Sequence, residues 1–316
     1  MGDAMIQRPA CLARAPRQAG FSLIELMVGI AIGLVVIAVM LQGFAASSST
    51  TRVNSLVSEY QTNGRYALDF LKREVQHAAL HPMVWDSAQV SVNATVSAKN
   101  FGCGAGASTD VMKGITAWND ANPYSANCLA TSSSRQYARG DVLLLRRVAL
   151  DAATAIDASA PYLRVGYSAG NVYLGGEAAI AMLAPFFDYR LLSDLYFINA
   201  FTTSSTEDPM VPALYRLTLS AGANPFLVPE LVASNVEHFA VQFGVLDTTG
   251  SLQYRNPDPA IDWTQVVSAR IWLLLRASSP ENGFASGTYT LGDVNYTPAD
   301  NFRRTVLSST INLRNR

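Results

Sequence analysis

The pattern of apolar and polar residues divides the chain into three regions. A continuous apolar stretch comes first, an amphipathic stretch follows, and in the long remainder apolar and polar residues alternate over short segments. Residues 21–46 predict a helix long enough to cross a bilayer of about 30 Å at ~1.5 Å per residue. Residues 47–81 continue this helix, because apolar side chains from Val53 to Ala78 recur every three or four positions along one face. Pro82 ends the pattern, since the residue before a proline is pushed out of the α region. The sequence therefore predicts one helix from about residue 22 to residue 80.

Residues 82–316 predict a globular domain of short strands bounded by turn residues. Residues 237–245 alternate clearly, and Val266–Ala277 is the most apolar run and predicts a central strand. There is no strand–helix alternation of the parallel α/β kind. The expected fold class is α+β, with the long helix packed on a mainly antiparallel β-sheet. Further strands are expected at Val90–Val96, Asp141–Val148, Leu195–Phe201, Leu214–Leu219 and Arg304–Leu313.

A basic leader comes before the apolar stretch, because residues 1–20 contain three arginines and no lysine. A Gly20-Phe21 junction follows, and Glu25 is the single charge in the apolar stretch. A secretory signal peptide would be cut after its apolar region, and the small residues 45–47 offer such a site. Cleavage between Gly20 and Phe21 would instead leave the apolar helix on the mature protein.

Residues 20–25, Gly-Phe-Ser-Leu-Ile-Glu, resemble the processing signal of the type IV pilins and pseudopilins. The resemblance implies that prepilin peptidase cuts after Gly20, removes residues 1–20 and methylates the new amino terminus at Phe21. It also makes Glu25 the glutamate that, in this family, pairs with the terminal amine of a neighbouring subunit and sets the register of the filament core. A chance acidic residue at the membrane interface is the alternative interpretation of Glu25.

The presence of a charged residue, Glu25, in the apolar stretch also needs a physical reason. A charged side chain in lipid costs about 2.5–3.5 kcal/mol at mid-bilayer and less near the interface. Cleavage would create a positive amine at Phe21, one helical turn away, which can neutralise the carboxylate. Gly29 and Gly33 have the small-xxx-small spacing of a helix-packing face. The leader arginines keep the amino-terminal end cytoplasmic, so the domain is expected in the periplasm.

The composition limits the remaining chemistry. The 316 residues are 49% hydrophobic and 15% charged, with a net charge of −1, which does not favour a nucleic-acid binder. Cys11 would leave with the leader, and Cys103 and Cys128 remain as a pair. In an exported domain this pair predicts a disulfide, which contributes roughly 3 kcal/mol in the chain-entropy model. Metal binding by two isolated cysteines is the alternative.

Catalytic motifs are absent from the sequence. His77 and His81 are four residues apart, but the glutamate of a zinc-protease helix is missing between them. His238 has no motif that supplies a nucleophile and an acid, and there is no Gly-x-Ser-x-Gly. We therefore expect no enzymatic activity, no cofactor and no metal.

Residues 235–244, 267–276 and 303–315 resemble PilW-type minor pilins, which are related to the J pseudopilin of type II secretion. Residues 83–190 match neither. The resemblance implies an inner-membrane subunit with a periplasmic domain, which joins a tip or priming complex that starts growth of a type IV pilus used in twitching motility. The implied partners are prepilin peptidase, other minor pilins, the major pilin and the inner-membrane assembly platform, with a tip adhesin as a further candidate. The alternatives are a J-type pseudopilin, a membrane-tethered periplasmic binding protein or adhesin, and an exported enzyme.

Overall fold

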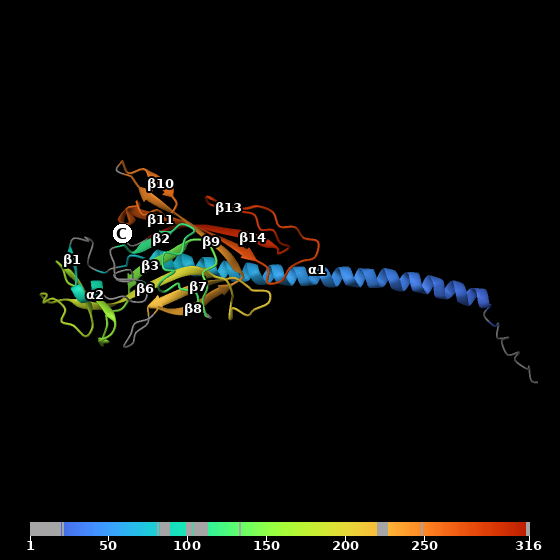
Figure 1. Ribbon diagram of the computed structural model, residues 1–316, viewed down its shortest axis with the longest axis horizontal. Helices are drawn as coiled ribbons and strands as arrows, with labels where there is room; N and C mark the ends of the chain where they lie inside the picture. Colours follow the sequence, from blue (N-terminus) through green and yellow to red (C-terminus); the bar gives the residue numbers. More distant parts are fainter. Residues whose placement is uncertain are drawn as a thin grey trace, which may run out of the picture. The chain divides into compact units, whose positions relative to one another are not determined.

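The computed structural model describes residues 20, 22–80, 82, 89–98, 103, 113–132, 134–219, 227–247 and 249–313. The chain divides into two compact units, Met1–Arg52 and Val53–Arg316. The helix α1 (Leu23–His77) contains residues of both, and every strand belongs to the second, globular unit (Figure 1). The long amino-terminal helix followed by mainly antiparallel sheets confirms the expected α+β fold class.

The carboxyl end of α1 is set by a tertiary contact rather than by proline alone. The helix ends at His77, before the predicted end at Leu80. Ala79 has a left-handed backbone, with φ of 58°, and its N–H donates to the carbonyl of Arg146 at 2.9 Å. Gly114 makes room for this turn, because a Cβ at Gly114 would lie 2.3 Å from the Cβ of Ala79. The chain therefore leaves the helix where it meets the first sheet.

The first sheet has eight strands in the order β1-β5-β4-β6-β3-β2, with β7 paired to β6 and β8 paired to β7. The long strand β6 is shared: residues 187–190 pair with β4, 191–196 with β3 and 194–199 with β7. All pairings in this sheet are antiparallel except that of β1 with β5. The strands are β1 (Val90–Val92), β2 (Ile115–Trp118), β3 (Val142–Val148), β4 (Pro161–Val165), β5 (Gly170–Leu174), β6 (Phe187–Asn199), β7 (Ala213–Leu219) and β8 (Leu227–Ser234).

The second sheet has four antiparallel strands in the order β10-β9-β11-β14. As predicted, β11 lies inside the sheet, between β9 and β14. A separate hairpin, β12–β13, covers part of the face away from α1, where Leu291 packs with Ala240 and Leu274. The elements are β9 (Val236–Leu246), β10 (Leu252–Arg255), the short 3-10 helix η2 (Trp263–Gln265), β11 (Val266–Arg276), β12 (Tyr289–Leu291), β13 (Val294–Tyr296) and β14 (Arg304–Asn312).

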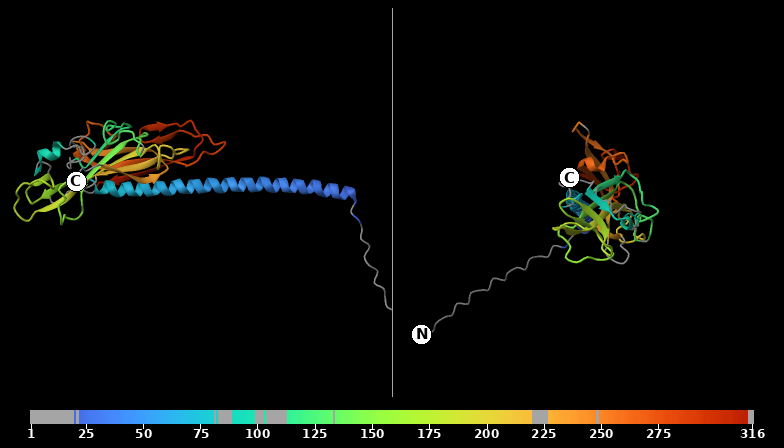
Figure 2. Two further views of the ribbon diagram at one scale, coloured as in Figure 1. Left: turned by 60° about the horizontal axis from the view of Figure 1, so that its bottom comes forward. Right: turned by 90° about the vertical axis from the view of Figure 1, so that its left-hand side faces the viewer.

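Two hydrophobic cores lie on the two faces of the first sheet. One core contains side chains of both sheets and of the second half of α1, which runs along the strands of the globular unit (Figure 2). The other core contains the disulfide. Strand β3 contributes to both, because Leu143 and Leu145 enter the first core and Val142 and Leu144 the second. A strand buried on both faces has a continuous apolar sequence rather than an alternating one, as β3 does.

Asp141 joins the two sheets. Its N–H donates to the carbonyl of Phe239 at 2.8 Å, and its Oδ2 accepts from the N–H of Val241 at 2.7 Å. Its Oδ1 accepts from the N–H of Asp120 at 2.8 Å. The carboxylate thus takes the place of a strand partner where β3 meets β9.

Most of the strands expected from the sequence are present, with shifted ends, but one region differs. Val90–Val96 was expected as a strand, whereas the structure has the short β1 followed by the helix α2 (Ala94–Ala98). β1 pairs parallel to β5, and Asn171 of β5 donates a side-chain hydrogen bond to the Asn93 side chain at 3.0 Å. The N–H of Asn93 still donates to the carbonyl of Val172 at 2.9 Å, and α2 begins at the next residue.

Candidate processing and assembly site

The helix α1 begins with a reciprocal pair of hydrogen bonds between Ser22 and Glu25. The N–H of Glu25 donates to Ser22 Oγ at 3.2 Å, and the N–H of Ser22 donates to Glu25 Oε2 at 3.1 Å. This capping box satisfies two of the backbone N–H groups that a helix leaves without partners at its start. The negative side chain also lies in the first turn, where the helix dipole favours it. Glu25 is thus held at the beginning of the apolar helix.

Gly20 lies outside the helix and is exposed, whereas the predicted new terminus, Phe21, lies outside the described residues. The bond between Gly20 and Phe21 therefore comes before the first helical residue, Leu23. A peptide bond outside regular helical hydrogen bonding is open to a protease. Cleavage and methylation at this bond stay predictions.

The first half of α1, residues 23–52, contains no buried residue. Its large apolar side chains are exposed by 45–78%. Gly29 and Gly33 share this exposure, because a Cβ at either position would meet nothing within 4 Å. α1 is also the one described helix that is long and apolar enough to cross a membrane. This half of the helix has the apolar surface of a segment that packs against lipid or other chains.

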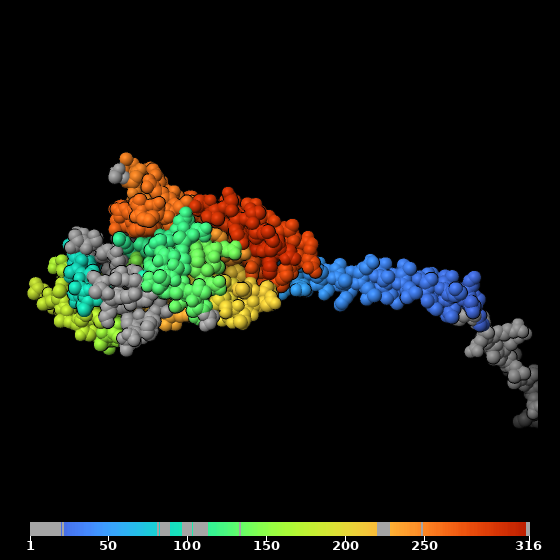
Figure 3. All heavy atoms as spheres, in the orientation of Figure 1, coloured from blue at the N-terminus to red at the C-terminus, as the bar shows by residue number. Residues whose placement is uncertain are grey.

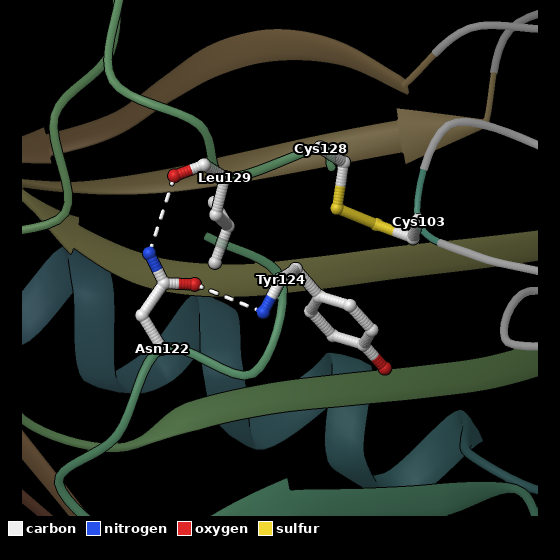
Figure 4. Close-up of a disulfide and its surroundings, with 5 residues drawn as sticks. All are labelled: Cys103, Asn122, Tyr124, Cys128 and Leu129. Carbon is white, nitrogen blue, oxygen red and sulfur yellow. Dashed lines mark hydrogen bonds between the residues drawn. A yellow bond between two sulfur atoms is a disulfide. The ribbon is translucent and has the colours of Figure 1, made fainter. Parts of the chain in front are cut away.

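The two remaining cysteines form a disulfide, as the cysteine count predicts (Figure 4). Cys103 and Cys128 have Cα atoms 4.7 Å apart and are almost completely buried. Asn122 fixes the loop around Cys128, because it accepts from the N–H of Tyr124 at 3.1 Å and donates to the carbonyl of Leu129 at 3.2 Å. The disulfide belongs to the second core, so it stabilises the globular unit.

A buried ionic network fixes the beginning of β14. The Arg304 side chain is fully buried and donates to Glu237 at 3.0 Å and to Asp300 at 2.6 Å. The hydrogen bonds from Arg304 lower the pKa of Asp300 to about 2. Arg276 and Arg139 each lie 3.8 Å from Glu237. Each charged side chain of this network has an oppositely charged partner, although Arg276 Nε has no hydrogen bond among the described residues. Paired charges of this kind are typical of a structural element.

Burial changes the pKa values of two groups where the sheets meet. It raises the pKa of the Asp141 carboxyl to about 7, against the opposing effect of the two backbone N–H groups bound to it. It also lowers the pKa of His238, whose ring lies 5.8 Å from that of Tyr296. His238 Nδ1 has no hydrogen-bond partner among the described residues.

Two observations concern the candidate metal and catalytic residues of the sequence. No group of three or more His, Cys, Asp or Glu side chains in the described part of the chain could hold a metal. His77 is the last residue of α1, but its predicted companion His81 lies outside the described residues. An open depression on the outer face of the second sheet is lined by Arg270, Trp272 and residues 308–310, which offer no acid–base pair.

Ser22 is the site residue that the sequence analysis missed. The signal was available, because Ser22-Leu23-Ile24-Glu25 has the spacing of a capping box before an apolar run. The structure brings Ser22 and Glu25 together at the start of the helix. Gly29 and Gly33 follow Glu25 along the helix by about one and two turns. The disulfide belongs to the other unit and has no part in this site.

Comparisons with known proteins match both ends of the chain. Residues 195–315 match the family model described as type IV pilus-assembly protein W, PilW. Residues 15–41 match the prokaryotic N-terminal methylation motif. A search of curated proteins finds no match. Among solved structures, a type IV-like pilin from Thermus thermophilus is similar at 14% identity and a TM-score of 0.33, covering 83% of this chain and 96% of its own.

Proposed function

We propose a specific role for this chain, which belongs to the type IV pilin family and is a minor pilin of the PilW type. It is a structural subunit of the complex that primes pilus assembly and then stays at the fibre tip. The observation that carries this proposal is the first half of α1, which is apolar and has no buried side chain. This half begins with the capping box formed by Ser22 and Glu25. The exposed apolar side chains of this half are removed from water only when lipid or other pilin helices surround them.

Processing comes first in the proposed sequence. Prepilin peptidase cuts between Gly20 and Phe21, before the first residue of α1, and methylates the amine of Phe21. The leader arginines hold this end at the cytoplasmic side of the inner membrane, and the globular unit is in the periplasm. The exposed Gly20 supports this proposal, because nothing in the described chain surrounds it.

Assembly follows from the charge at Glu25. Ser22 satisfies the N–H of Glu25, and within the described part of the chain the carboxylate has no ion pair with a cation. The terminal amine of a neighbouring subunit supplies that cation in the filament core. Gly29 and Gly33 let the two helices approach closely, since neither carries a side chain and both are open. The partners are thus other minor pilins and the major pilin, assembled by the inner-membrane platform.

The size of the globular unit favours a minor over a major subunit. Residues 53–316 form one unit with two cores, which is bulky for every position along a thin fibre. A small number of copies at the tip avoids this packing problem.

Three variants separate the two roles of the helix start. Glu25→Ala removes the charge and the cap, Glu25→Gln keeps a hydrogen-bond acceptor for Ser22 but removes the charge, and Ser22→Ala keeps the charge. We expect both Glu25 variants to remain in the membrane and to lose incorporation into fibres by about ten- to a hundredfold, the value of a charge-assisted contact. Ser22→Ala loses only a cap worth about 1 kcal/mol and keeps most incorporation.

Fibre fractions quantified by immunoblot, with mass spectrometry of the mature amino terminus, provide the readout. N-methylated phenylalanine establishes processing, whereas an intact leader or a cut near Ala46 contradicts it. Full incorporation of the Glu25→Gln chain would make α1 a mere tether, as in a membrane-anchored binding protein.

A further inference from the structure

The connection between β5 and β6 contains ten consecutive residues without a polar side chain. Residues 178–187 read Ala-Ala-Ile-Ala-Met-Leu-Ala-Pro-Phe-Phe and are flanked by Glu177 and Asp188. They lie outside the residues matched by either family model. A run of this kind normally enters a core, so its place in the fold needs a reason.

These residues lie on the surface instead. Leu183 is 93% exposed, and Phe186 and Phe187 are about two-fifths exposed, at 38% and 42%. Tyr167, in the turn between β4 and β5, is 77% exposed. The lobe formed by residues 149–191 projects at one end of the globular unit (Figure 3). The β4–β5 turn lies against the apolar run, because a Cβ at Gly166 would be 3.6 Å from the sulfur of Met182 and 3.9 Å from the carbonyl oxygen of Pro185. Exposed apolar side chains gathered in this way typically mark a binding site.

The loop is held in this position by the strands beside it. Asn171, a fully buried residue of β5, accepts from the N–H of Ile180 at 3.2 Å. The guanidinium of Arg164 lies 4.5 Å from the ring centre of Phe186 and binds both carboxylate oxygens of Asp188 at 2.9 Å. The side of the Phe186 ring that faces Arg164 is therefore occupied, and the apolar surface is built with its other side outward.

The charges around the patch indicate what binds there. The lobe, residues 149–191, contains four acidic and two basic residues. Arg164 is bound to Asp188, and Arg190 interacts with Asp157, which leaves Asp151 and Glu177 without a basic partner in the lobe. A second copy of the chain would bring acidic lobes together, and anionic lipid head groups would be repelled.

We propose that the patch formed by Tyr167, Ile180, Leu183, Phe186 and Phe187 docks a different protein, whose contact surface is apolar and rimmed by lysine or arginine. This inference goes beyond the proposed role of α1, because the patch lies in the globular unit and uses none of the helix residues. The apolar centre supplies affinity, and the acidic rim selects a basic partner over another copy of this chain.

The test uses the full chain in its own membrane. A photo-cross-linking amino acid replaces Tyr167, and a matched probe replaces Leu252, an apolar residue of β10 that is 47% exposed. We expect a discrete adduct with another protein from position 167 and none from position 252. The cross-linked peptide of the partner should contain apolar residues next to lysine or arginine. An adduct with a second copy or with phospholipid, or no adduct, would overturn the proposal.

Two substitutions test the chemistry of the contact in the chain that carries the probe at 167. Leu183→Ser should lower the adduct yield about tenfold, the effect of losing one buried leucine side chain, and Leu252→Ser should not. Glu177→Lys should lower the yield as well, and added salt should weaken the complex in detergent. Unchanged yields in the Leu183→Ser and Glu177→Lys chains would mean that neither the apolar side chains nor the acidic residues of the lobe bind the partner.

A further variant keeps this inference separate from the filament role. The adduct should persist when Glu25 is replaced by alanine, since the lobe does not depend on pairing at the helix start. Loss of the adduct in that chain would mean that the patch alone does not hold the partner. Equal thermal unfolding of the Leu183→Ser and unsubstituted chains checks the fold, because a side chain that is 93% exposed contributes little to it.

Discussion

The two halves of α1 share one backbone but differ in what surrounds their apolar side chains. Residues 23–52 bury none of theirs, whereas Tyr60, Ala67, Leu71 and Val75 in the second half are at most 3% exposed and enter the first core. The second half is stabilised by its own chain. The first half has no such partners among the described residues, and in the proposed function lipid or other pilin helices supply them.

The same difference applies to the carboxylates of the two regions. Asp141 and Glu237 are buried among donors from other strands of the same chain. Glu25 receives only the local N–H of Ser22. A region whose polar groups have partners far along the chain folds by itself, and a region with only local partners depends on another molecule. Substitutions at matched positions in the two halves therefore should have opposite consequences.

The largest expected difference is between two leucines. Leu71→Ala removes a side chain that is fully buried and should lower the free energy of unfolding of the globular unit by about 2–5 kcal/mol. Leu34→Ala removes one that is 62% exposed and should leave it unchanged. All four tryptophans follow Val53, so urea unfolding of the full chain in detergent, followed by tryptophan fluorescence, reports on this unit alone. Equal urea midpoints for the two variants would mean that the two halves of α1 do not differ in their contribution to the stability of the globular unit.

Two glycines provide a smaller effect of opposite origin, because here a group is added. A Cβ at Gly64 would lie 2.1 Å from Cδ1 of the buried Leu275, so Gly64→Val should cost about 1–3 kcal/mol by overpacking. Gly29→Val has open space, with nothing within 4 Å. The helix propensity of valine is only a few tenths of a kcal/mol better than that of glycine, so it does not offset the overpacking at Gly64. The same urea experiment measures the first effect, and fibre incorporation measures any effect at Gly29.

Local patterns in the sequence were sufficient for the helix and for the strands β3, β6, β7, β9, β11 and β14, whereas β2, β4, β5, β8, β10, β12 and β13 were not predicted. The apolar repeat from Val53 to Ala78 predicted the buried stripe, and the alternation in residues 237–245 predicted β9. These features depend on neighbours within a few residues, which the sequence displays directly. The same holds for the capping box, which a search for Ser-x-x-Glu would have found.

Contacts between distant residues account for what the sequence did not predict. The division into two sheets depends on Asp141, which bonds to Val241 one hundred positions away, and no local pattern identifies that pair. The end of α1 depends on Ala79 meeting Arg146. The apolar loop at 178–187 reads as a core segment, and only the packing of β4, β5 and Arg164 leaves it exposed. These features need the fold before they can be stated.

The last expected effect is a dependence of stability on pH that arises from Asp141. Burial raises the pKa of its carboxyl from 3.8 to about 7, so the folded state holds this proton more tightly than the unfolded state. The contribution of the group is therefore complete below pH 3.8 and is lost as the pH rises through about 7. His238, with a lowered pKa, acts in the opposite direction below its ordinary value of 6.5.

A comparison with Asp141→Asn separates the two groups, because the variant keeps His238 and cannot ionise at position 141. We expect the unsubstituted chain to lose more stability than the variant between pH 5 and pH 8, in urea midpoints measured by tryptophan fluorescence. A constant offset from the altered hydrogen bond to Val241 does not change this slope. Parallel curves would mean that the two backbone N–H donors fully offset the effect of burial on the pKa of Asp141. The carboxyl group would then not titrate between pH 5 and pH 8, like a carboxyl group at the surface.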